Sequence, residues 1–122
     1  MLNQQLRDEI MLLHAQVCGA LADPSRILIL YSIAEQPRSV GELVKMLDLS
    51  QPTVSRHLQN LRDRRLVVAS REGQNVFYSL ADPRVIQALD LLRAVLADNL
   101  LHQGNLAEKV ETTPISGGIE KT

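Results

Sequence analysis

Residues 40–66 constrain the fold most, because they contain two signals for helix starts separated by a short connection. Ser39 followed three residues later by Glu42 forms a capping box, which predicts a helix beginning at position 40. Ser50 can cap a second helix, and Pro52 is tolerated in its first turn, where the missing N–H would have no partner. The segment therefore predicts two short helices joined by a tight turn, the second ending near residue 65.

The second of these helices has one apolar face and one polar face. Val54, Leu58 and Leu61 recur at intervals of four and three residues, which places them on one inward stripe. The remaining positions carry side chains that form hydrogen bonds: Gln51, Thr53, Ser55, Arg56, Gln59 and Asn60. Groups of this kind contact base edges and phosphates in DNA. The pattern predicts a helix-turn-helix whose second helix enters a major groove.

A β-hairpin is predicted directly after this helix, because the apolar period changes from 3.6 to about two residues after Leu66. Two β-rich runs follow at residues 67–71 and 75–80, and Gly73 lies in the turn between them. A hairpin in this place is the wing of a winged helix-turn-helix. Arg71, Gln74 and Asn75 lie at or near its tip, where an arginine can enter a narrow minor groove.

Helices are also expected on both sides of this region. Residues 2–21 are helical in pattern, and the Asp23-Pro24 pair starts a short helix that ends near residue 34. The Asp82-Pro83 pair starts a last helix that ends near residue 101. The first and last helices carry more apolar surface than a small domain can bury, so we predict that they form a homodimer interface. Its seams are Leu6, Ile10, Leu13, Val17, Leu89, Leu92 and Leu96.

Composition favours one folded domain followed by a polar tail. The chain has 122 residues, of which 45% are hydrophobic, and residues 1–102 can form one aliphatic core. Residues 103–122 are rich in Gly, Thr, Ser, Glu and Lys and are expected to be disordered. The sequence has no run of 18 apolar residues and no signal-peptide pattern, so we expect a cytoplasmic protein without membrane contact.

Positive charge is concentrated where DNA contact is predicted. The whole chain has a net charge of −1, whereas residues 51–75 contain five arginines and two acidic residues, a net charge of +3. A basic stripe on a mildly acidic body suits a protein that docks on DNA through one face. No Ser/His/Asp or Cys/His set, glycine-rich phosphate loop or paired carboxylate has a plausible scaffold, so an enzyme is not expected.

The order of elements and three sequence blocks resemble the ArsR/SmtB family of dimeric winged-helix repressors. The blocks are LADPSRILIL at 21–30, VGELVKMLDLSQPTVSRHLQNLRDRRLV at 40–67 and REGQNVFYSL at 71–80. The resemblance implies a mainly α fold with a small β-hairpin, in the order α-α-α-α-β-β-α. It also implies a homodimer that binds an operator in double-stranded DNA as a repressor and leaves it when an effector binds. The two-fold symmetry of such a dimer then requires an inverted-repeat operator.

The resemblance also carries over DNA contacts. On the recognition helix it assigns base contacts to Gln51, Ser55, Arg56 and His57, and places Thr53 and Gln59 nearer the phosphates. His57 lies beside Leu58, so it could instead pack at the edge of the helix. Arg71 is the best candidate on the wing.

The effector sites of the family are incomplete in this sequence. A metal site on the third helix would fall on Ser39 and Gly41, and neither residue supplies a thiolate. A site on the last helix would fall on four positions that suit a transition metal poorly: Asp82, Arg84, Val95 and Asp98. The cysteine pair of redox-sensing relatives is missing too, since Tyr31 takes its first place and the last helix has no cysteine. We expect no metal and no cofactor.

Three alternatives stay open for function. Cys18, four residues after His14, could form a thiol or metal sensor with His14 and His102 at the dimer interface, or could be a small buried side chain. The effector, a small molecule or an oxidant, is not identified by the sequence, and a constitutive repressor without a ligand is the second alternative. The third is a winged helix that binds a protein, because a fold alone does not fix function.

Overall fold

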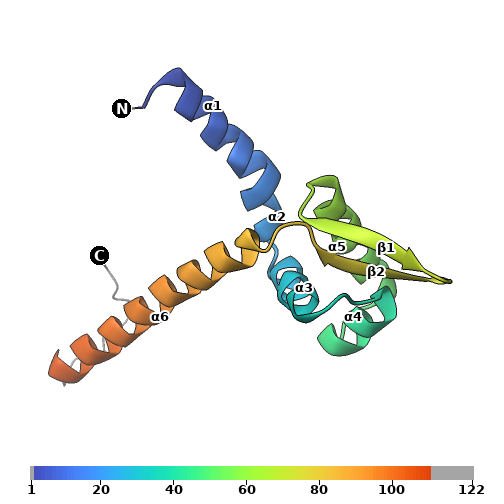
Figure 1. Ribbon diagram of the computed structural model, residues 1–122. Helices are drawn as coiled ribbons and strands as arrows, with labels where there is room; N and C mark the ends of the chain where they lie inside the picture. The colour runs from blue at the N-terminus through green and yellow to red at the C-terminus, as the bar shows by residue number, and fades with distance from the viewer. Residues whose placement is uncertain (1, 111–122) are drawn as a thin grey trace. The chain divides into compact units, whose positions relative to one another are not determined.

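The computed structural model describes residues 2–110, with side chains described through residue 104 (Figure 1). It confirms the predicted fold, in which helices precede and follow one antiparallel hairpin. The elements are α1 (Gln4–Leu13), the π-helical turn η1 (His14–Cys18), α2 (Gly19–Leu21), α3 (Pro24–Glu35), α4 (Val40–Leu47), α5 (Gln51–Asp63), β1 (Val67–Glu72), β2 (Asn75–Leu80) and α6 (Arg84–Val110).

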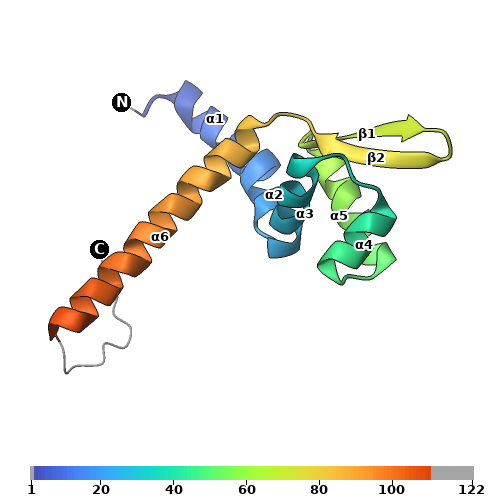
Figure 2. The ribbon, with the colours of Figure 1, turned by 60° about the horizontal axis from the view of Figure 1, so that its bottom comes forward.

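The chain divides into two units between Ile86 and Gln87, so that α6 begins in the first unit and continues into the second. In the first unit, α3, α4 and α5 pack together and the hairpin projects from them (Figures 1 and 2). The core of this unit is aliphatic, as the scarcity of aromatic residues requires. Its buried apolar residues are Ala20, Ile29, Leu30, Ile33, Leu43, Val54, Leu58, Leu61, Leu66 and Val67.

The helix predicted over residues 2–21 is present, but it contains a π turn that the sequence pattern did not predict. α1, η1 and α2 follow one another without a break from Gln4 to Leu21. Asn3 caps the start, where its Oδ1 accepts a hydrogen bond from the Leu6 N–H at 2.8 Å. Single π turns inside helices occur frequently at functional sites. None of the residues of α1 is buried within the described part of this single chain.

The predicted helix starts are confirmed by their hydrogen bonds. Asp23 Oδ1 accepts from the Ser25 N–H at 2.8 Å, with Pro24 as the first helical residue of α3. At α4 the capping box is complete, because Ser39 Oγ accepts from the Glu42 N–H at 3.2 Å and Glu42 Oε1 accepts from the Ser39 N–H at 2.9 Å.

The connection between α4 and α5 is short because α4 ends at a residue in the left-handed region. Asp48 has φ 55° and ψ 47°, a conformation that aspartate tolerates better than most residues. Its N–H donates to the carbonyl of Val44. Two residues later Ser50 caps α5, and its Oγ accepts from the Thr53 N–H at 3.3 Å.

The wing is attached to the helix-turn-helix by backbone hydrogen bonds. β1 and β2 pair antiparallel from Val67 opposite Leu80 to Glu72 opposite Asn75, so the first strand is one residue longer than predicted. Gly73 turns the chain with φ +66°, which favours glycine. Arg38, just before α4, exchanges two backbone bonds with Tyr78 of β2, at 3.1 and 2.8 Å. The wing and the start of α4 are therefore held together.

The last helix differs from the prediction at its C-terminal end. Asp82 Oδ1 accepts from the Arg84 N–H at 2.9 Å, as expected of a residue at a helix start. α6 continues to Val110, so the expected disorder of residues 103–110 is wrong. Extending an existing helix costs far less than starting one, and residues 106–109 (Leu, Ala, Glu and Lys) are good helix formers. The rest of the predicted tail, residues 111–122, lies outside the described residues.

Within residues 2–110 no single helix is long and apolar enough to cross a membrane. Gln4–Leu21 and Pro24–Glu35 reach that length and hydropathy only as a pair, and this pair is bent by 83°.

Candidate nucleic-acid interface

The outer face of α5 presents polar side chains opposite the buried stripe. Val54, Leu58 and Leu61 have at most 1% of their surface exposed, which fixes the rotation of the helix about its axis. As a result, the structure brings four of the predicted contact residues to one exposed surface: Gln51, Ser55, Arg56 and Gln59.

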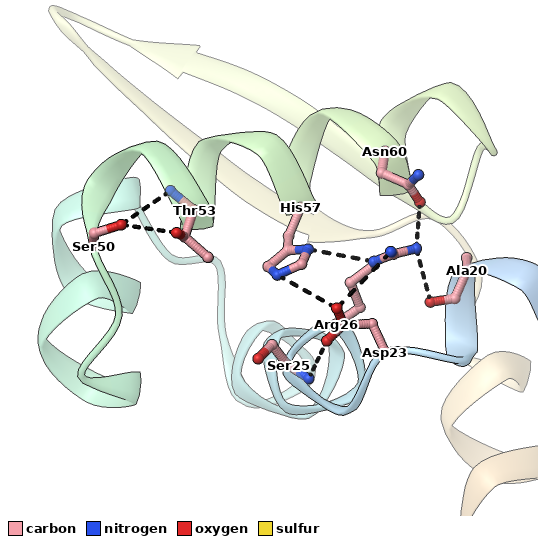
Figure 3. Close-up of polar contacts among 8 residues, drawn as sticks. All are labelled: Ala20, Asp23, Ser25, Arg26, Ser50, Thr53, His57 and Asn60. Carbon is pink, nitrogen blue, oxygen red and sulfur yellow. Dashed lines mark hydrogen bonds and ion pairs between the residues drawn. The ribbon is translucent and has the colours of Figure 1, made fainter.

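Two of the predicted contact residues, Gln59 and Thr53, bond to other side chains of the protein, whereas Arg56 does not. Gln59 Nε2 donates to Asp63 Oδ1 at 2.8 Å, one turn further along the helix. Thr53 is half-buried, and its Oγ1 accepts from the Ser50 hydroxyl at 2.8 Å (Figure 3). Arg56 is exposed and forms neither a hydrogen bond nor a salt bridge with any residue that the structure describes. Its five N–H donors are available to a ligand.

The wing adds a second exposed polar surface. Arg71, Gln74 and Asn75 are all exposed at the end of the hairpin that is furthest from the start of β1. Asn75 begins β2 opposite Glu72, and Arg71 pairs in register with Val76. The predicted wing residues thus lie together around the turn.

The predicted DNA contact of His57 is wrong, because its side chain faces inward and is only 7% exposed. Its Nδ1 accepts a hydrogen bond from Arg26 Nε at 3.3 Å, and its Nε2 lies 3.9 Å from Asp23 Oδ2 (Figure 3). The reason is its place on α5, three residues after Val54, one before Leu58 and beside the buried stripe. That spacing was visible in the sequence and favours packing over DNA contact.

Burial lowers the pKa of His57 from its usual value of 6.5. Asp23 opposes this shift, whereas the positive charges of Arg26 and Arg56 add to it. The imidazole is therefore neutral near pH 7, as it must be for Nδ1 to accept a hydrogen bond.

Arg26, which the sequence did not single out, links three helices through its guanidinium. Its Nη1 donates to Asn60 Oδ1 at 3.0 Å and to the carbonyl of Ala20 at 3.3 Å (Figure 3). With its bond to His57, one guanidinium therefore joins the start of α3 to α2 and α5. Asn60, expected on the polar surface, is half-buried and turned toward this cluster. The only local sign of this role in the sequence was the three-residue spacing from Asp23 to Arg26. In the structure, Asp23 Oδ2 lies 4.0 Å from Arg26 Nη2.

The residues considered for sensing are placed as follows. Cys18 is exposed rather than packed, at the end of η1, and His14 is exposed at its start. His102 is exposed on α6, in the other unit. Among the described residues, no group of three or more His, Cys, Asp or Glu side chains is arranged to hold a metal ion within one chain.

The seams predicted to form a dimer interface are mostly uncovered in the single chain. On α1, Ile10 and Leu13 are 48% and 50% exposed, and Leu6 and Val17 are partly exposed. On α6, Leu92 and Leu96 are exposed. Leu89 is the exception, since it is already buried and has little surface left to lose to a second chain.

Comparisons with known proteins agree with this geometry. Residues 23–68 match the family described as bacterial regulatory protein, arsR family. The chain is 44% identical over 85 residues to a probable mercury resistance operon repressor of Streptomyces lividans, covering 70% of this chain and 68% of that one. It is 40% identical over 102 residues to a transcriptional repressor SmtB homolog of Synechocystis, covering 80% and 74%.

A solved structure is similar over nearly its whole length. It is the solution structure of a homodimeric winged helix-turn-helix DNA-binding domain from Mycobacterium bovis, a possible ArsR-family transcriptional regulator. The TM-score is 0.71 at 29% identity, and the match covers 83% of this chain and 93% of that chain.

Proposed function

This chain belongs to the ArsR/SmtB family of winged-helix transcriptional repressors, and we propose that two copies bind an inverted-repeat operator through α5 and the wing of each. The observation that carries the proposal is the outer face of α5, where Arg56 is exposed and has no partner among the described residues, while the opposite stripe is buried. A helix presented in this way can enter a major groove without disturbing the core.

Each part of the surface has its own role in this proposal. Gln51, Ser55 and Arg56 read base edges, because the N-terminal part of a recognition helix lies deepest in the groove. Thr53 and Gln59 contact phosphates. Arg71, Gln74 and Asn75 on the wing reach the neighbouring minor groove, whose negative potential attracts arginine.

A homodimer supplies the two-fold symmetry that an inverted repeat requires. The support is the uncovered apolar surface on the two flanking helices, since a contiguous apolar face on a single chain marks an interaction site. We propose that Ile10 and Leu13 of α1 and Leu92 and Leu96 of α6 belong to this interface. Two recognition helices related by a two-fold axis then address half-sites about one helical turn, or a multiple of it, apart.

We propose that neither metal site typical of the family releases this protein from DNA. Ser39 is engaged in the capping box of α4. Asp82 forms hydrogen bonds with the backbone and side chain of Arg84, which lower the pKa of this carboxyl to about 2. A repressor that responds through Cys18 is a second candidate, favoured by the exposure of this thiol.

Stoichiometric zinc and a mild oxidant separate these two candidates when each is added to the protein–DNA complex. We expect neither to change DNA affinity of the wild type or of Cys18→Ser. Zinc or oxidant that strips the wild type from DNA, but spares Cys18→Ser, would place the sensor at Cys18.

The proposed contacts are tested with an operator duplex that the wild type selects from a random pool. Arg56→Ala should cost about 1–3 kcal/mol of binding free energy and relax the preference at one base pair. Arg71→Ala should weaken binding with less change in preference. Arg7→Ala, which removes an exposed arginine of α1, is the control for charge alone. Unchanged affinity of Arg56→Ala at moderate salt would refute the proposed role of α5.

The alternative of a protein-interaction module makes a different prediction. Contacts to phosphates release counterions, so DNA affinity should fall linearly with the logarithm of the salt concentration. Weak binding to random duplex that does not depend on salt would instead favour the interaction module.

A further inference from the structure

The C-terminal end of α5 is joined to the N-terminal helix by an arginine. Arg64 follows the last residue of α5, and its side chain reaches η1, 48 and 49 residues earlier in the chain. There Nη1 donates to the carbonyl of Gln16 at 3.2 Å and to the carbonyl of Ala15. A carbonyl oxygen has two lone pairs, so helical carbonyls can accept a bond from outside the helix.

The helix is shaped to receive this guanidinium. The two carbonyls belong to the π turn, and the guanidinium lies over the residue that follows that turn, Gly19. A Cβ atom at Gly19 would lie 3.3 Å from Arg64 Nη1, closer than most Cβ contacts. The absence of a side chain at this position therefore leaves room for the arginine.

Arg26 makes a similar contact one turn further along the same helix. It donates to the carbonyl of Ala20 and, through His57 and Asn60, to the inner face of α5. Two arginines thus connect α5 to carbonyls within residues 15–20. Arg64 does so from the end of α5, and Arg26 of α3 does so through its bonds to His57 and Asn60 of α5. α5 is therefore linked by polar bonds to this helical segment at two separate points.

We propose that Arg64 is a positioning residue, which sets the separation of the two recognition helices in the dimer by fixing α5 on η1. The inference rests on the proposed function, which places Ile10 and Leu13 in the dimer interface. Residues 4–21 form one continuous helix, so the helix that Arg64 contacts is the same helix that carries these two interface residues. A recognition helix that is fixed to this helix is fixed relative to the two-fold axis. One that is not fixed can still read a half-site but holds its spacing to the other half-site less strictly.

The experiment measures this separation without DNA and the spacing preference with it. Nitroxide labels on Ser55→Cys, in a Cys18→Ser background, report the distance between the two α5 helices of a dimer by pulsed electron spin resonance. DNA binding is measured on unlabelled Cys18→Ser proteins, which keep Ser55 because it is a proposed base contact. Arg64→Ala removes the contact. Gly19→Val displaces the guanidinium while every charge and all of α5 stay unchanged. Arg62→Ala is the matched control, because it removes one exposed arginine from α5 itself.

We expect a single narrow distance in the parent and in Arg62→Ala, and loss of that narrow maximum in Arg64→Ala and Gly19→Val. On DNA, one base pair added between half-sites rotates them by about 35°. It should weaken binding of the parent about tenfold and that of the two variants only about twofold, while a base change within a half-site costs about tenfold in all.

Narrow, unchanged distances in Arg64→Ala and Gly19→Val would overturn the inference, as would an equal loss in Arg62→Ala. A parent protein that gives no dipolar signal, and therefore no dimer, would overturn the proposed function and this inference together. Unfolding in urea is measured on the same samples, and a cooperative transition in each variant serves as the control that the variant is folded.

Discussion

Replacing Arg26 by Met tests the polar cluster beneath the recognition helix. The change keeps most of the aliphatic stem but removes three hydrogen bonds, to His57 Nδ1, Asn60 Oδ1 and the Ala20 carbonyl. Because His57 is only 7% exposed, its Nδ1 is left without a partner in a place that water reaches poorly. A buried acceptor without a partner costs about 1–3 kcal/mol, and the two more accessible acceptors add less, so we expect a loss of about 2–3 kcal/mol.

The assay is unfolding in urea followed by circular dichroism, at one fixed protomer concentration because dimerisation adds to apparent stability. Arg7→Met, an exposed substitution of the same type, should change the free energy of unfolding by less than about 0.5 kcal/mol. In a double-mutant cycle with His57→Leu, the two losses should overlap by about 0.5–3 kcal/mol. An Arg26→Met loss no larger than that of Arg7→Met, or additivity in the cycle, would show that the cluster does not hold α5.

Three further predictions follow from single residues. Since burial lowers the pKa of His57 in the folded protein, the unfolded chain binds a proton at this residue more tightly. The free energy of unfolding in urea should therefore keep its full value above pH 6.5 and fall as the pH drops below 6.5, and it should fall less steeply with pH in His57→Gln. Ser39→Ala removes one half of the capping box and should lower the free energy of unfolding by about 1 kcal/mol in urea, whereas the neighbouring exposed change Gly41→Ala should not. Asp48→Gly should raise the thermal midpoint, because glycine adopts φ 55° without a penalty; a lower midpoint would show that the Asp48 side chain stabilises the turn.

The parts of the fold that the sequence predicted are those governed by local interactions. The caps at Asp23, Ser39 and Ser50 join residues two or three positions apart, so the bonds can be inferred from the residue types alone. The hairpin was predicted for the same reason, since Gly73 and the alternating strands around it lie within 14 residues. The outer face of α5 followed from the spacing of its buried stripe.

The parts that were missed depend on residues far apart in the chain. The partner of His57 could not be identified, because Arg26 is 31 residues away and nothing in the sequence pairs the two; only the spacing of His57 from Val54 favoured packing. The contact of Arg64 with η1 spans almost 50 residues, and the π turn itself has no residue pattern of its own. The boundary set at residue 102 gave more weight to the composition of the tail than to the low cost of extending a helix.

The central claim is that two copies of this chain read an inverted repeat, and selection from a random duplex pool tests it most directly. The purified protein is incubated with the pool at moderate salt, the retained duplexes are sequenced, and the mass of the complex with one selected duplex is measured by light scattering. We predict two-fold symmetric sequences with half-sites about one helical turn, or a multiple of it, apart, and two chains per duplex. Enrichment of an asymmetric site bound by one chain, or retention of duplexes with no common sequence, would contradict it.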